Sequence, residues 1–209
     1  MYLPASFKED RVSVLHEAIR SIKIGTLVTL SGEGLEASHL PMLIDPEPAP
    51  FGTLYGHFAR ANPQWKRAPA SPEALVTFLG PNAYVTPSWY ETKRETGKVV
   101  PTWNYITVHA YGTPRFIQDR EGLLDIVTRL TTTHESGRAA PWAVTDAPAD
   151  YIDGMLKAIV GFALPITRLE GKWKLSQNRN PADIAGVREG HKQELGDDAA
   201  ALAEAMNAL

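Results

Sequence analysis

Apolar positions recur along this chain with two different periods, and each period predicts one type of element. Within residues 6–22, Val12, Leu15 and Ile19 fall three or four positions apart and share one face, which predicts an amphipathic helix. Within residues 104–117, apolar and polar side chains alternate, which is typical of a β-strand with one buried face. The chain therefore combines both types of element.

Further segments follow the same two patterns. Short β-like runs bounded by glycine and proline turn signals predict strands at residues 24–31, 35–43, 53–58, 73–80 and 159–176. Helical patterns predict helices at residues 119–135, 147–158, 180–190 and 197–209.

Capping residues indicate where several helices begin and end. Ser6 and Glu9 have the spacing of a capping box at the start of the first helix. Asp119 and Asn180 are suited to cap two later helices, and a proline follows Asn180 at the first helical position. Gly190 is expected to stop the second of these helices.

Prolines and one polar segment limit the strands. Pro41 restricts its strand to an edge or a bulge. Pro81 and Pro87 are expected to break the extended run over residues 81–90. The polar residues 91–102 are expected to be mobile.

β-runs dominate residues 24–113, and helices flank and follow them. Six or seven short strands, mostly linked as hairpins, indicate a small antiparallel barrel of the α+β class. The sequence shows no internal repeat, no sustained alternation of strand and helix, and no glycine-rich dinucleotide fingerprint.

Composition narrows the function classes. The 209 residues carry a net charge of −3, so no global positive field attracts nucleic acid. There is no cysteine, which excludes disulfides, thiolate metal sites and cysteine nucleophiles and fits a reducing cytoplasm. The first residues lack a signal-peptide pattern, and no apolar run is long enough to span a membrane.

The stretch "GHFARANPQWK", residues 56–66, concentrates polar chemistry after a predicted strand. Arginine and lysine provide charged donors there, and asparagine and glutamine provide neutral ones. A turn with converging donors can bind phosphate. A solvated loop around a core tryptophan is an equally good interpretation.

Three histidines, His39, His57 and His109, lie on separate predicted strands. Together they could bind a metal or haem iron, although none has metalloprotease spacing. A structural hydrogen-bonding role is the alternative for each.

Aromatic and basic residues form two further candidate groups. Trp103 belongs to a tryptophan- and tyrosine-rich window that could stack on a flat cofactor or form a core or interface. Lys172, Lys174 and Arg179 surround a tryptophan and could contact phosphate or nucleic acid, or form a solvated strand end.

Several of these stretches occur together in a familiar order. The sequence closely resembles the PaiB-like family of FMN-binding negative transcriptional regulators from Met1 to about residue 187. The blocks that carry the resemblance are "MYLPASF", "SHLPML", "GHFARANPQW", "GPNAYVTPSWY", "VPTWNYITVHAYGTP", "AIVGF" and "LEGKWKLSQNR".

The resemblance implies a flavin-binding split barrel of the pyridoxamine phosphate oxidase-like group. It implies six strands, a homodimer, and FMN held at the subunit interface, with haem as the alternative cofactor. We expect a split-barrel domain with peripheral helices over residues 1–190 and a helical tail over residues 191–209.

Related split barrels hold the flavin phosphate with strand and turn residues. The nearest matches in this sequence are Ser38, His39, Arg60, Asn62, Gln64 and Lys66. With His57, Trp103 and Lys174 they form the predicted cofactor-binding set. The arginine–lysine strand of the oxidases has no equivalent beyond "HLPMLI", so a weaker flavin site or another ligand stays an alternative.

Three functions follow as expectations. The first is a cytoplasmic FMN-binding homodimer that acts as a sensor or negative transcriptional regulator. The second is a flavin- or haem-dependent oxidoreductase, with His57 and His109 as acid–base candidates. The third is a DNA-binding repressor that needs no cofactor, although no helix-turn-helix pattern is evident.

Overall fold

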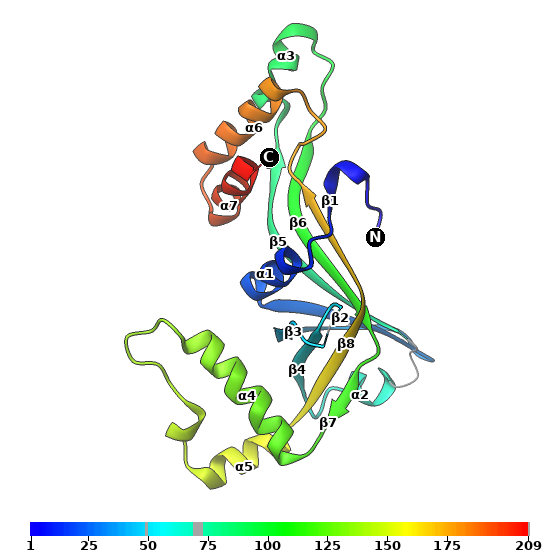
Figure 1. Cartoon of the computed structure of the whole chain (residues 1–209), viewed down its shortest axis with the longest axis vertical. Coiled ribbons are helices and arrows are strands. Elements are labelled where there is room, and N and C mark those ends of the chain that lie inside the picture. Colours follow the sequence, from blue (N-terminus) through cyan, green and yellow to red (C-terminus); the bar gives the residue numbers. More distant parts are fainter. Residues whose placement is uncertain (49, 69–72, 209) are drawn as a thin grey trace. The chain divides into compact units, whose positions relative to one another are not determined.

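A computed structural model describes residues 1–48, 50–68 and 73–208 (Figure 1). Its strands are β1 Lys8–Glu9, β2 Ile24–Ser31, β3 Gly34–Asp45, β4 Thr53–Ala59, β5 Ala74–Val85, β6 Thr102–Gly112, β7 Arg115–Ile117 and β8 Ile159–Lys174. Its α-helices are α1 Val12–Ile22, α2 Gln64–Arg67, α3 Glu91–Thr96, α4 Arg120–Glu135, α5 Ala149–Lys157, α6 Pro181–Gln193 and α7 Asp197–Ala205. Short 3₁₀ turns include η1 Ala5–Phe7, η3 Pro87–Trp89, η4 Val144–Asp146 and η5 Met206–Ala208.

The strands form one hydrogen-bonded sheet. Their order is β1-β8-β4-β3-β2-β5-β6, with β7 on β8, and an additional pairing joins β8 to β6. That pairing closes β8, β4, β3, β2, β5 and β6 into a ring. The pairings β2–β3, β2–β5, β3–β4 and β4–β8 are antiparallel. The predicted α+β class and six-stranded split barrel are therefore confirmed.

The chain divides into two compact units. The central unit consists of His16–Phe78 and His109–Leu169. The terminal unit consists of Met1–Leu15, Leu79–Val108 and Glu170–Leu209.

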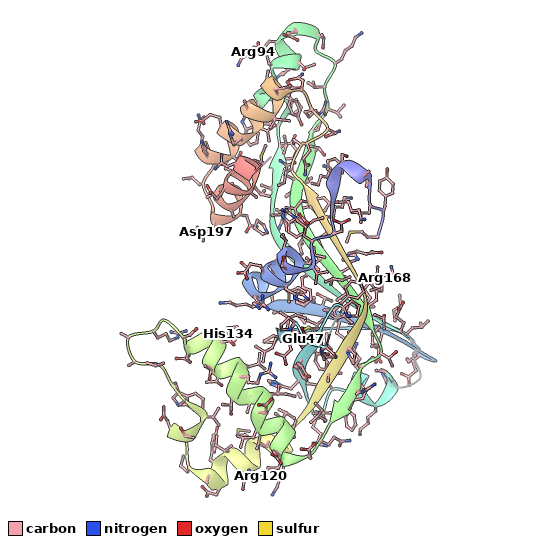
Figure 2. The ribbon with its side chains drawn as sticks, in the orientation of Figure 1. Glu47, Arg94, Arg120, His134, Arg168 and Asp197 are labelled. Carbon is pink, nitrogen blue, oxygen red and sulfur yellow. The ribbon has the colours of Figure 1, made fainter. Side chains whose placement is uncertain are left out.

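Aromatic side chains form the core of the central unit. Phe58 of β4 and Phe162 of β8 are fully buried, with ring centroids 5.5 Å apart. A Cβ at Gly56 would lie 2.7 Å from the Phe162 ring, so only glycine leaves room for that ring. Helix α4 packs against β3 and β4, and Arg120 at its start donates to Asp153 of α5 at 2.8 Å (Figure 2).

Side chains from the middle and the C-terminal part of the sequence build the core of the terminal unit. Helices α6 and α7 lie side by side (Figure 1). The buried cluster contains Val85, Tyr90, Ile106, Leu175, Val187, Leu202 and Met206. The C-terminal helix is thus part of a core, and the boundary predicted at residue 190 falls inside α6.

The start of the first helix differs from the prediction. Helix α1 begins at Val12, because Lys8 and Glu9 form β1 and pair with β8. The predicted Ser6–Glu9 capping box is wrong. The Glu9 carboxylate instead accepts a hydrogen bond from the backbone N–H of Arg11 at 2.9 Å.

Two other helix predictions are confirmed and one is wrong. Asp119 and Asn180 both cap their helices through side-chain oxygens. Gly190 does not stop α6, which continues to Gln193. A Cβ at Gly190 would lie 2.2 Å from the Trp89 ring, so this glycine permits close packing.

Prolines affect the strands less than predicted. Strand β5 continues through Pro81 to Val85, because extended backbone accommodates the proline φ angle. Pro41 lies within β3 at the last residue paired with β2, and pairing with β4 begins at Met42. The missing N–H of Pro41 therefore falls where the partner strand changes.

The segment predicted to be mobile contains a helix. Residues Glu91–Thr96 form α3, which ends at Gly97 with a positive φ of 68°. Asp183 of α6 accepts hydrogen bonds from the backbone N–H and the hydroxyl of Thr92 at 3.0 and 2.8 Å. Sequence polarity alone does not reveal this distant partner.

Candidate functional site

The turn after β4 holds Gln64 at the centre of a hydrogen-bond network. The Gln64 side chain is 2% exposed. Its amide nitrogen donates towards Leu27 O (3.2 Å), Thr29 Oγ1 (3.0 Å) and Glu36 O (3.1 Å). Its amide oxygen accepts from Ser38 Oγ at 2.5 Å. Gln64 therefore joins α2 to β2 and β3.

Asn62 completes the same network. Its Nδ2 donates to Ser38 Oγ at 2.8 Å, and its Oδ1 accepts from the backbone N–H of Gln64 at 2.9 Å. Ser38, Asn62 and Gln64 are thus brought together, and their assignment to a flavin phosphate stays a prediction. Their polar atoms bond mainly to one another and to the sheet, which fixes the shape of the turn.

Arg60 is also engaged with the protein itself. Its Nε donates to Lys157 O (2.7 Å), Nη1 to Gln118 Oε1 (3.0 Å) and Nη2 to Ile159 O (2.8 Å). The Arg60 carbonyl accepts from Trp65 Nε1 at 3.0 Å. The guanidinium group thereby fastens the end of β4 to the start of β8.

His39 and Lys66 are the more accessible members of the predicted set. His39 lies on the exposed face of β3, and its Nδ1 is 2.8 Å from Thr26 Oγ1. Lys66 is exposed, with its ammonium group 5.4 Å from the Trp65 ring centroid. Their assignment to a phosphate stays a prediction.

His57 borders a cavity of about 310 Å³ in the central unit. Most of the other lining residues are apolar and come from α4, η4, α5 and the start of β8. Trp142, Tyr151 and Met155 line this cavity while remaining 45%, 59% and 45% exposed. The buried His57 Nδ1 has no hydrogen-bond partner. The cavity can accommodate a mostly apolar molecule.

The three strand histidines do not gather into a metal site. His39 lies on the exposed face of β3, whereas His57 lies against the α4–α5 cavity. Among the residues that the structure describes, no group of three or more His, Asp or Glu side chains could hold a metal ion. The suggestion that His39, His57 and His109 jointly bind a metal is therefore wrong.

Lys174 and Trp103 meet in the terminal unit. Lys174 Nζ donates to Thr102 Oγ1 at 2.5 Å and to the carbonyl oxygen of Trp103. The Trp103 indole is 52% exposed and makes an edge contact with Tyr84, at a centroid distance of 6.2 Å. Burial lowers the pKa of Lys174, and the nearby charges of Lys172 and Arg179 lower it further.

A buried polar group in the terminal unit was not predicted from the sequence. Ser176 Oγ donates to Asn104 Oδ1 at 3.0 Å, and Asn104 Nδ2 lies 3.2 Å from His191 Nε2. Asn104 and His191 are fully buried. Asn104 lies on the buried face of β6, whose side chains mostly alternate between buried and more exposed positions. A polar residue at such a position indicates a buried hydrogen bond, and this is the signal in the sequence that could have revealed the group.

Acid should destabilise the protein through His191 and His57. Burial lowers the pKa of both imidazoles, so the unfolded chain takes up protons below about pH 6.5 that the folded chain does not. Their stabilising contribution is complete above that pH and is lost as the pH falls towards the lowered values. We expect a decrease of up to about 1.4 kcal/mol per pH unit for each histidine.

Urea unfolding at a series of pH values measures this slope. His191→Gln should make it shallower, whereas His134→Gln, at an exposed position on α4 (Figure 2), should leave it unchanged. An unaltered slope in His191→Gln would contradict the assignment.

Comparison with known proteins identifies the family. The profile of the family described as "Putative FMN-binding domain" matches residues 1–168. The chain belongs to this FMN-binding family. It is also 34% identical over 206 residues to the protease synthase and sporulation protein PAI 2 of Bacillus subtilis, which covers 99% of this chain and 96% of that protein. The resemblance to the PaiB-like family is thereby confirmed, and flavin is the cofactor of the FMN-binding family.

Solved structures of flavin proteins share the fold. The FAD and haem binding protein of Mycobacterium smegmatis has a TM-score of 0.61 at 15% identity, covering 85% of this chain and 78% of that one. The flavocytochrome Anf3 of Azotobacter vinelandii has a TM-score of 0.55 at 14% identity, with the same coverage. No helix in the described part of this FMN-binding family member is long and apolar enough to cross a bilayer.

Proposed function

We propose that this chain is a cytoplasmic FMN-binding homodimer that works as a flavin-dependent sensor and acts negatively on transcription. The relative in Bacillus subtilis is named for protease synthesis and sporulation, which supports a regulatory role. Flavin would supply the electron-transfer chemistry that ordinary side chains lack.

An exposed apolar face of the sheet is the observation that supports the proposed homodimer. The outward-facing positions of β2 and β3 include Leu30 and Leu35, which are 54% and 75% exposed and directly opposite in register. Val28 and Ala37 form the next pair on the same face. A second copy is the natural occupant, because a two-fold dimer places the same patch against itself.

The aromatic residues of the terminal unit fit a flavin. Trp103 and Tyr84 are 52% and 44% exposed and contact each other, so their rings offer a surface on which a flat isoalloxazine can stack. Lys174 supports this surface through its bond to the Trp103 carbonyl. These residues would bind and orient the flavin.

Direct DNA binding has less support. Of the three bases predicted to contact nucleic acid, Lys172 is 8% exposed and donates to Tyr2 O at 3.2 Å. DNA affinity depends on cations that reach phosphates on an open surface. The proposed regulator would therefore act through a change in the flavin-bound dimer.

An oxidoreductase is the second candidate function. The cavity of about 310 Å³ beside His57 could admit a small apolar substrate, while burial keeps the histidine pKa low and the imidazole neutral near pH 7. Oxidation of NAD(P)H dependent on added FMN, or ascorbate-driven loss of added haemin, would favour this candidate over a sensor.

Flavin titration tests the proposal. Purified protein should quench FMN fluorescence with a Kd on the order of 1 μM, about −8 kcal/mol. Trp103→Ala should weaken FMN and riboflavin binding alike, because stacking involves the ring that both share. Absence of quenching by the unmodified protein at saturating FMN would refute the proposed function.

A further inference from the structure

Three positive side chains converge at the end of β8 in the terminal unit. Lys172 and Lys174 lie two residues apart on one face of the strand, and Arg179 follows in the next turn. Both ammonium groups lie near the Tyr105 ring, at 5.3 Å and 5.9 Å from its centroid. We call Lys172, Lys174 and Arg179 the basic pocket.

The contacts of the basic pocket are with neutral groups. Lys172 donates to a backbone carbonyl, and Lys174 donates to a hydroxyl and a carbonyl. The Arg179 guanidinium lies 4.7 Å from the Tyr90 ring centroid. Throughout residues 1–48, 50–68 and 73–208, no carboxylate forms an ion pair with any of these three side chains.

Such a group of like charges is unfavourable without an anion. Lys172 is only 8% exposed. Removing a charge from water costs free energy unless an opposite charge compensates it. Repulsion from Lys172 and Arg179 contributes to the lowered pKa of Lys174. A bound anion would relieve both penalties.

A hollow beside these side chains has room for one anionic group. It measures about 160 Å³ and is lined by Lys174 and Arg179. Thr102, Ser176 and Asn178 add hydroxyl and amide groups to the lining. Whole cofactors occupy sites of about 300–1,000 Å³, so this hollow suits a phosphate group.

We propose that the basic pocket of Lys172, Lys174 and Arg179, with the hollow beside it, binds the phosphate group of FMN. This inference rests on the proposed function. It relocates the phosphate from the turn after β4, where the neutral side chains of Asn62 and Gln64 bond within the protein. Charge-assisted bonds to phosphate would replace the neutral contacts of the pocket.

The comparison of FMN with riboflavin isolates the phosphate. Riboflavin has the same ring and lacks the phosphate. Lys174→Gln should weaken FMN binding roughly 10- to 100-fold, the loss of one charged hydrogen bond, and weaken riboflavin binding much less, through loss of the bond to the Trp103 carbonyl. Arg179→Gln should weaken FMN binding and leave riboflavin binding unchanged, because the bonds to Thr102 and Trp103 remain. Lys98→Gln, an exposed lysine in the same unit, is the matched control and should leave both affinities unchanged.

A thermal-unfolding experiment with inorganic phosphate tests the basic pocket in the absence of flavin. Phosphate should raise the Tm of the unmodified protein, and this increase should be smaller in Lys174→Gln and in Arg179→Gln. A DNA duplex should give no comparable increase; a larger, salt-sensitive effect of DNA would overturn the assignment to a mononucleotide phosphate.

The outcomes separate the two proposals. If the unmodified protein binds neither FMN nor riboflavin, the proposed function fails, and the inference about FMN fails with it. If both flavins bind and Lys174→Gln and Arg179→Gln weaken them equally or not at all, the phosphate assignment alone is overturned.

Discussion

Replacing Gln64 with alanine is expected to lower the free energy of unfolding by about 3 kcal/mol. The amide donates towards three acceptors on β2 and β3 and accepts from Ser38. Each buried group left without a partner costs about 1–3 kcal/mol, and the vacated volume adds a cavity penalty. Urea unfolding, followed by tryptophan fluorescence, measures the difference.

Lys66→Ala is the matched control for this prediction. Lys66 lies two residues further along α2 and is exposed, and its side chain donates no hydrogen bond to another described residue. A change within about 0.5 kcal/mol is therefore expected. If Gln64→Ala kept full stability and lost only FMN affinity, Gln64 would serve as a cofactor ligand and the structural interpretation would be wrong.

Leu35→Glu is expected to dissociate the proposed dimer. Leu35 is 75% exposed within one chain, so the fold should tolerate the change. In a two-fold interface the new charge appears twice and becomes buried without a partner. We expect at least a roughly 100-fold weaker dimer, about 2.7 kcal/mol, in sedimentation equilibrium.

Leu195→Glu makes the same substitution at a position that is 101% exposed in the terminal unit. It should leave the dimer constant unchanged. Equal behaviour of the two variants would show that the β2–β3 face is not the contact between copies.

Much of the fold could be predicted because its signals are local. The alternation over residues 104–117 and the oxygen caps Asp119 and Asn180 depend on neighbours within a few positions. Two of the errors involve partners distant in sequence. Residues Glu91–Thr96 became a helix beside Asp183, and Gly190 packs against Trp89 instead of ending α6.

The candidate site shows the same division. The sequence singled out Ser38, Asn62 and Gln64 as candidate phosphate ligands, and in the structure they bond to one another. Whether a polar side chain serves the fold or a ligand depends on where its hydrogen bonds end. For Gln64 they end on Leu27 and Glu36, which lie 37 and 28 residues away. Composition and residue spacing do not predict contacts between residues so far apart in the sequence.

Sedimentation of the protein with FMN, monitored in the flavin absorption band, tests the central claim most directly. We expect flavin absorbance to sediment with a species of twice the chain mass of 22.9 kDa, at one FMN per chain. Flavin that stays at the meniscus, or that sediments with a single chain, would contradict it.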